Sequence, residues 1–202
     1  MRLSHLLICT LLASTTLFSC KNDTKNNDAA DNAEIVDTTV VKNVKETKEQ
    51  QKAIANSVLA KLMTTPETLS FTRYLISANL TDIISKNKGP YTIMAPSNEA
   101  FAKLSKLALD SLTSQSGIEK LSLVLKGHII EGDFSSASLL QSVKKTGNYK
   151  MNTLSGTSLT VFMEGSNIMI KDDSGAVGKM GKSDILSGNG QVHVIDAVLG
   201  NF

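Results

Sequence analysis

The spacing of apolar side chains predicts helices in the first half of the folded region. Ile54, Val58 and Leu62 recur at every fourth position, which is the period of a helix with one buried face. Residues 65–67, Thr-Pro-Glu, place a capping hydroxyl, a proline and an acid in the order typical of a helix start. A further short helix is indicated by the apolar residues at 80–84.

Capping signals mark the ends of two more helices. Ser97 can cap a helix over residues 98–104. Ser116 and Glu119 have the spacing of a capping box, and the helix that they begin should end near Gly127.

Strand patterns dominate the second half. One short strand, residues 91–95, is already predicted among the helices of the first half, and in the second half residues 159–163 and 168–170 alternate between apolar and polar positions. Residues 164–167, Glu-Gly-Ser-Asn, are typical of a hairpin turn between the two alternating segments. Residues 192–195 form a last strand. Helices first and antiparallel strands later predict an α+β domain.

The first 19 residues differ from the rest. Arg2 precedes an apolar run shorter than the roughly 20 residues needed to span a bilayer, which is typical of a signal peptide. The run ends in Leu-Phe-Ser-Cys at residues 17–20 and resembles a bacterial lipoprotein signal, which implies lipidation of Cys20. An ordinary signal peptide, or an uncleaved anchor, is the alternative.

Residues 20–52 are rich in Asn, Asp, Lys and Thr. Such a segment buries too little apolar surface to offset its ordering entropy, so we predict a flexible polar tether. The alternative is a helix that begins early, near Asn43. The folded domain is then residues 53–202.

Composition restricts the chemistry. The net charge of +2 excludes a strongly basic nucleic-acid binder, and 4% aromatic residues without tryptophan argue against stacking surfaces. Cys9 lies in the leader and Cys20 would carry lipid, so the folded part has no thiol. We therefore expect no metal site, no cofactor and no catalytic residue.

Two segments resemble the signature segments of fasciclin-type adhesion domains, namely residues 91–101 and 189–199. Shorter motifs lie between them in the family's order, at His128, at Thr-Leu-Ser-Gly (153–156) and at Asp-Ile (184–185). The resemblance extends from near Ala55 to the last residue. The matching signature residues are Thr92, Ala95, Pro96, Asn98, Glu99, Ala100, Phe101, Asn189, Gly190, His193, Ile195 and Asp196.

This resemblance implies a fasciclin-like wedge or sandwich of antiparallel strands, with signature residues that are mainly structural. It also implies candidate partner-binding residues at Asp184, Ile185 and His128. Gly127 stands where the family has a tyrosine, so only the histidine of that pair carries over. The alternatives are a buried histidine at position 128 and a carboxylate at position 184 that caps local backbone.

The function that follows is a non-catalytic, membrane-anchored, extracytoplasmic adhesion module that binds surface or matrix components. The chain is expected in the cell envelope, at the outer membrane, facing the surface or the periplasm. Its partners would be the membrane, through the lipid, and an extracellular protein or polysaccharide, but no nucleic acid. The alternative is a ligand-binding or scaffold lipoprotein for a small molecule, lipid or polysaccharide.

Overall fold

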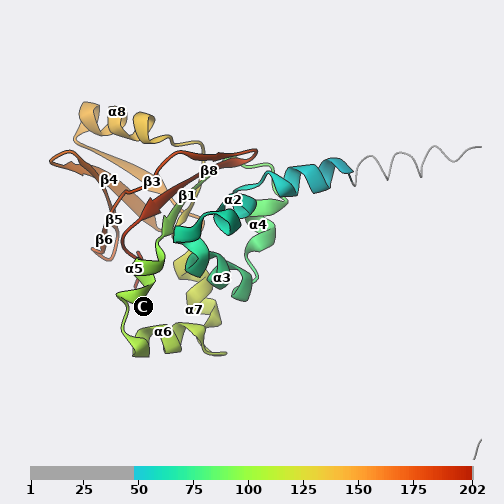
Figure 1. The fold of residues 1–202 in the computed structure, drawn as a ribbon. Coiled ribbons are helices and arrows are strands. Elements are labelled where there is room, and N and C mark those ends of the chain that lie inside the picture. Colours follow the sequence, from blue (N-terminus) through green and yellow to red (C-terminus); the bar gives the residue numbers. More distant parts are fainter. Residues whose placement is uncertain (1–47, 202) are drawn as a thin grey trace, which may run out of the picture. The chain divides into compact units, whose positions relative to one another are not determined.

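The computed structural model describes residues 48–201. In this part of the chain the strands form two four-stranded sheets, with the orders β2-β1-β8-β7 and β3-β4-β5-β6 (Figure 1). The strands are β1 (Tyr91–Pro96), β2 (Ile129–Glu131), β3 (Asn148–Asn152), β4 (Ser158–Glu164), β5 (Asn167–Asp172), β6 (Val177–Lys179), β7 (Ile185–Ser187) and β8 (Gly190–Ile195).

Helices come mainly before β2, as the sequence predicts, and the α+β fold class is confirmed. After a helix over residues 48–55, the helices are α2 (Val58–Thr64), the 3-10 turn η1 (Pro66–Thr68), α3 (Leu69–Ser77), α4 (Thr81–Ser85), α5 (Asn98–Ala102), α6 (Lys106–Thr113), α7 (Ile118–Lys126) and α8 (Ser136–Thr146). None of the helices within residues 48–201 is long and apolar enough to cross a membrane.

The first sheet separates two hydrophobic cores. All six residues of β1 are buried, because both faces of this strand are covered. Ile93 and Ala95 pack into a first core with helices α2 to α7, whereas Met94 points into a second core with β3 to β5 and α8. The long antiparallel strands therefore lie on one side of β1, and most of the helices lie on the other (Figure 1).

The centre of the first sheet is a parallel pair. β1 and β8 align over six positions, from Tyr91 opposite Gly190 to Pro96 opposite Ile195. The other pairs of named strands are antiparallel. Gly190 has φ 146°, and a Cβ there would lie 1.9 Å from the Tyr91 carbonyl oxygen, so no larger residue fits where the two strands first meet.

The turn between β7 and β8 is fastened to the start of α2. Asn189 Oδ1 accepts the Val58 N–H at 2.8 Å, and Asn189 Nδ2 donates to the Ile84 carbonyl at 2.9 Å. The Gly188 N–H donates to the Asn56 carbonyl at 2.6 Å. These bonds satisfy helix-end groups that would otherwise be left without partners.

The predicted helix through residues 54–62 is interrupted. Residues 56 and 57 form a turn, and the Ser57 hydroxyl accepts the Ala60 N–H at 3.3 Å to cap α2. Val58 and Leu62 are fully buried, but Ile54 belongs to the preceding helix and is 40% exposed. That preceding helix includes residues 48–52, the last part of the expected tether; the rest of the tether and the leader lie outside the described residues.

The predicted capping box is wrong, although the helix is found. α7 begins at Ile118 after Gly117, whose N–H donates to Ser114 Oγ at 3.1 Å. The side chains of Ser116 and Glu119 therefore do not cap it. The predicted end of this helix, at Gly127, is confirmed.

α8 has no counterpart among the predicted elements. Only Leu139 and Val143, one helical turn apart, are buried, while serine, lysine and glutamine cover its other faces. The Ser135 hydroxyl caps it by accepting the Ser138 N–H at 3.2 Å. Two buried side chains are a weak periodic signal, and this explains why the alternating strands that follow obscured the helix.

Candidate functional site

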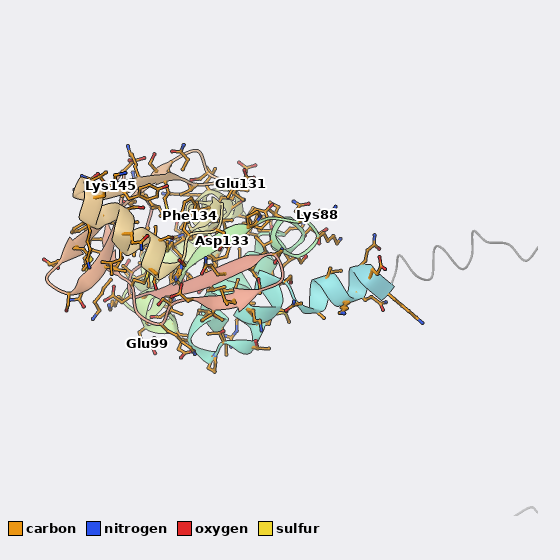
Figure 2. All side chains as sticks on the ribbon, turned by 90° about the horizontal axis from the view of Figure 1, so that it is seen from above. Lys88, Glu99, Glu131, Asp133, Phe134 and Lys145 are labelled. Carbon is orange, nitrogen blue, oxygen red and sulfur yellow. The ribbon has the colours of Figure 1, made fainter. Side chains whose placement is uncertain are left out.

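The connection from β2 to α8 lies against the first sheet and is held there by side chains of β1 and β8. Figure 2 labels two of its residues, Asp133 and Phe134. Thr92 Oγ1 donates to the Gly132 carbonyl at 2.8 Å and accepts the Phe134 N–H at 3.0 Å. Gln191 Nε2 donates to the Asp133 carboxylate. Thr92 and Gln191 are buried and Asp133 is exposed, so these partly buried bonds fasten the connection to the sheet.

His193 lies beside this connection and is fully buried. Its Nε2 bonds the Phe134 carbonyl at 2.8 Å, and its Nδ1 accepts the Asp184 N–H at 3.1 Å. A carbonyl on one nitrogen and an N–H on the other define a neutral ring with its proton on Nε2. Burial lowers the pKa of His193 and outweighs the Phe134 carbonyl and the carboxylates of Asp184 and Asp133, which raise it.

Asp184 fixes the start of α8. Its backbone has φ 57°, a conformation that few residues other than glycine, asparagine and aspartate adopt readily. Asp184 Oδ1 accepts the Ser136 N–H at 2.8 Å, and Oδ2 accepts the Ser136 hydroxyl. Partial burial raises the pKa of Asp184, but the hydrogen bonds from Ser136, with smaller contributions from His193 and Ser183, together outweigh it, and the net pKa is lowered. The carboxylate therefore caps a helix 48 positions away in the sequence.

The apolar side chain exposed beside Asp184 is Leu186. Side chains alternate along β7, so Ile185 packs against the first core while Leu186 is 66% exposed. The Asp-Ile motif of the resembling family pointed to Ile185. The sequence pattern did not show which face of this three-residue strand each side chain occupies, so Leu186 was missed. A strand prediction over residues 185–187 would have assigned the two side chains to opposite faces.

His128 is fully buried at the first core and lies away from the residues that contact Asp184. It is 0% exposed, its Nδ1 bonds the Val124 carbonyl at 2.8 Å, and its Nε2 accepts the Leu199 N–H at 3.0 Å. The Phe71 ring packs edge-on with centroids 5.8 Å apart. Burial lowers the pKa of His128 from 6.5 to about 4. In this arrangement a partner has no access to the imidazole, and His128 and Asp184 share no hydrogen-bond partner.

The remaining signature residues make contacts inside the domain. Asn98 Oδ1 accepts the Ser70 N–H at 2.9 Å, and its Nδ2 donates to the Pro66 carbonyl at 2.8 Å. This amide, rather than the Thr65 hydroxyl predicted from the sequence, serves the start of α3. Asp196 Oδ1 accepts the Lys179 N–H at 2.7 Å, which joins the end of β8 to β6.

The other signature side chains divide by exposure. Glu99, labelled in Figure 2, is exposed in the first turn of α5. The buried ones are Ala95, Pro96, Ala100, Phe101 and Ile195. Among residues 48–201 no group of three His, Cys, Asp or Glu side chains is placed to hold a metal ion.

Comparison with known proteins agrees with this architecture. The fasciclin domain model matches residues 66–201. Immunogenic protein MPT70 of Mycobacterium tuberculosis is 32% identical over 126 residues, which cover 60% of this chain and 54% of that protein. Cell surface glycolipoprotein MPB83 of Mycobacterium bovis is 31% identical over 121 residues, covering 60% and 47%. The chain thus spans about half the length of these curated relatives.

A solved structure shares the fold. It is a FAS1 domain pair from the insect cell adhesion molecule Fasciclin I, with a TM-score of 0.55 and 24% identity, covering 68% of this chain and 46% of that one. The chain belongs to the fasciclin domain family.

The two buried imidazoles should make folding sensitive to acid. Both have lowered pKa values in the folded chain, whereas an unfolded histidine titrates near 6.5. The unfolded state therefore binds more protons below pH 6.5, and stability falls as the pH drops toward 4. From His128 alone we expect a loss of about 2 kcal/mol by pH 5, above the main range of carboxyl titration.

Urea unfolding at a series of pH values measures this loss. His128→Gln, which retains an acceptor for the Leu199 N–H, should be less stable at pH 7 but show a shallower decline between pH 6.5 and 5. Equal stability of the native chain at pH 7 and pH 5 would contradict the assignment of two neutral, buried rings.

Asp184→Ala should destabilise the fold. The substitution removes the acceptor for Ser136 and places alanine at positive φ, each at a cost of about 1 kcal/mol. Asp184→Asn is the matched control, because asparagine tolerates this backbone and can still accept the Ser136 N–H. We expect a loss near 2 kcal/mol for alanine and less than half of that for asparagine, measured by urea unfolding. An unchanged urea midpoint for Asp184→Ala would contradict this structural role and would leave the carboxylate as a candidate contact group for a partner.

Proposed function

We propose that this chain is a membrane-anchored, extracytoplasmic interaction module, lipidated at Cys20, which binds surface or matrix components without catalysis. The observation that carries the proposal is the exposed apolar side chain of Leu186, two residues from Asp184, whose hydrogen bonds hold the backbone there. Membership of the fasciclin family supports it, as does one relative that is by name a cell surface glycolipoprotein.

The contact surface that we propose is the outer side of β7. This strand lies at the edge of the first sheet, so one of its sides has no neighbouring strand within that sheet. Leu186 projects from the face of β7 opposite the first core, while the bonds of Asp184 to Ser136 and His193 hold the adjoining backbone. A large apolar side chain on rigid backbone is a suitable anchor for a protein contact, because little conformational entropy is lost on binding.

We propose a non-catalytic function because both histidine rings are buried and fully hydrogen-bonded. His128 and His193 each have both ring nitrogens hydrogen-bonded and no exposed surface. A general base must reach the proton that it removes, and neither ring does so in this conformation.

A second candidate function, ligand binding by an envelope lipoprotein, is favoured by one observation. A groove of about 540 Å³ lies along α7, within the range of roughly 300–1,000 Å³ typical of small-molecule sites. It involves none of the residues of the β7 surface, so the two functions are compatible.

Leu186→Ser should reduce adhesion without reducing stability. Beads that carry the chain can be counted on a layer of whole cells or of extracellular matrix, and we expect about five-fold fewer bound beads. Leu107→Ser is the matched control, since Leu107 is another leucine, 82% exposed, on α6. If the two variants bind equally and have equal melting temperatures, the β7 surface is not the adhesive contact.

Cys20→Ala should abolish lipid labelling. Cells fed an alkyne fatty acid should label the native chain and Cys9→Ala, but not Cys20→Ala. Trypsin added to intact cells then reports the location: release of the domain supports adhesion at the surface. Protection until the outer membrane is opened contradicts it and favours the periplasmic, ligand-binding alternative. Label retained in Cys20→Ala would refute the anchor.

A further inference from the structure

The groove along α7 has three other walls. They are the β3–β4 turn, the β5–β6 turn and the segment after β8, at residues 199–201. The Gly200 N–H is bonded to the Asp172 carboxylate, and the Leu199 N–H to the buried ring of His128, so the C-terminal wall is fixed at two successive residues. Hydrogen bonds therefore hold the C-terminal wall of the groove in place.

Contacts along α7 give the groove a direction. Lys120, Val124 and Gly127 line it on successive turns of the helix, and seven helical positions span about 10 Å. At one end, a Cβ on Gly127 would lie 3.5 Å from Ser155 Oγ; in the middle, a Cβ on Gly200 would lie 3.5 Å from Val124 Cγ2. The missing side chains of these two glycines leave the space open.

The middle of the groove is apolar. Leu123 is 56% exposed, although it belongs to a helix whose neighbouring Val124 and Leu125 are buried. Leu159 and Leu199, each 1% exposed, line the groove below. An exposed leucine over a floor of buried leucine side chains suits the hydrocarbon body of a ligand.

Hydroxyl groups occupy the Gly127 end. Thr153 Oγ1, Ser155 Oγ and Thr157 Oγ1 lie 2.8–3.0 Å from one another in a closed triangle. Their hydrogen bonds are largely spent on one another and on the Thr157 carbonyl. This end offers weak polar contacts but no cation.

The two carboxylates that line the groove already have hydrogen-bond or ion-pair partners within the domain. The Asp172 carboxylate accepts from Ser174 Oγ, the Ala176 N–H and the Gly200 N–H. Asp173 accepts the Ser158 N–H and lies 3.8 Å from Lys150 Nζ.

Lys120 forms no ion pair with these two acids. It belongs to none of the four ion pairs found within residues 48–201. Its ammonium group is therefore the available charge at the end of the groove opposite the hydroxyl triangle.

We propose that this groove binds an amphipathic monoanion of the fatty-carboxylate type. The hydrocarbon chain lies along Leu123 and Val124, and the carboxylate meets Lys120. The negative charge of Asp173 is partly compensated by Lys150, and that of Asp172 by three hydrogen-bond donors, whereas the charge of Lys120 has no such partner within residues 48–201. The proposal goes beyond the adhesive function and does not depend on it.

The test uses the full chain in detergent-free buffer and two amphiphiles with the same hydrocarbon tail. Dodecanoate and dodecyltrimethylammonium, both below their micelle concentrations, compete with the fluorescent probe anilinonaphthalene sulfonate. We expect dodecanoate to displace the probe with an affinity about ten-fold higher than that of the cation. Equal displacement by both, or by neither, overturns the proposal.

Two pairs of variants locate the site. Lys120→Gln should weaken dodecanoate binding about five-fold, whereas Lys126→Gln, on the same helix but outside the groove lining, should leave it unchanged. Leu123→Ser should weaken both the probe and dodecanoate, whereas the exposed-leucine control Leu107→Ser should weaken neither. Identical affinities within either pair overturn the assignment. Bead adhesion of Lys120→Gln should equal that of the native chain, which separates this result from the fate of the β7 surface.

Discussion

The parallel pairing of β1 with β8 is the contact on which the rest of the structure depends. It joins strands that are far apart in sequence, and its register places Thr92, Gln191 and His193 on the same side of the sheet. These three side chains hold the β2–α8 connection, and Asp184 then fixes the first residue of α8. A shift of one position would turn the polar side chains into the helical core and the apolar ones toward the connection.

This arrangement explains why the two signature segments carry so many polar residues in buried or half-buried places. Asn189 serves the start of one helix and the end of another, Asn98 serves α3, and Asp196 joins β8 to β6. Each removes the penalty of a backbone group without a partner. Such residues stabilise one arrangement of the chain over its competitors, because their partners lie in other elements.

The sequence predicted much of what depends on near neighbours, although the local capping assignments at Ser116 and Thr65 were wrong. Ser97, Gly127 and the Glu164–Asn167 turn act within a few positions, and the structure has their elements where they were expected. It could not predict what depends on distant ones. The partner of Asp184 is Ser136, and the helix that Ser136 begins had too few apolar residues to be recognised. The exposure of Leu186 in place of Ile185 likewise follows from the pairing of β7 with β8, which no local pattern contains.

The bonds between the β7–β8 turn and the start of α2 have a mechanical consequence. Consider a chain that is fixed on the N-terminal side of α2 and bound by a partner at β7. A pulling force then acts between these two points. Because Gly188 is bonded directly to Asn56, and Asn189 to Val58, tension between the segment before α2 and β7 passes through a few short hydrogen bonds. Val58 at one end of this route and Ile185 at the other both pack in the first core, so a pull between the two places also loads that core.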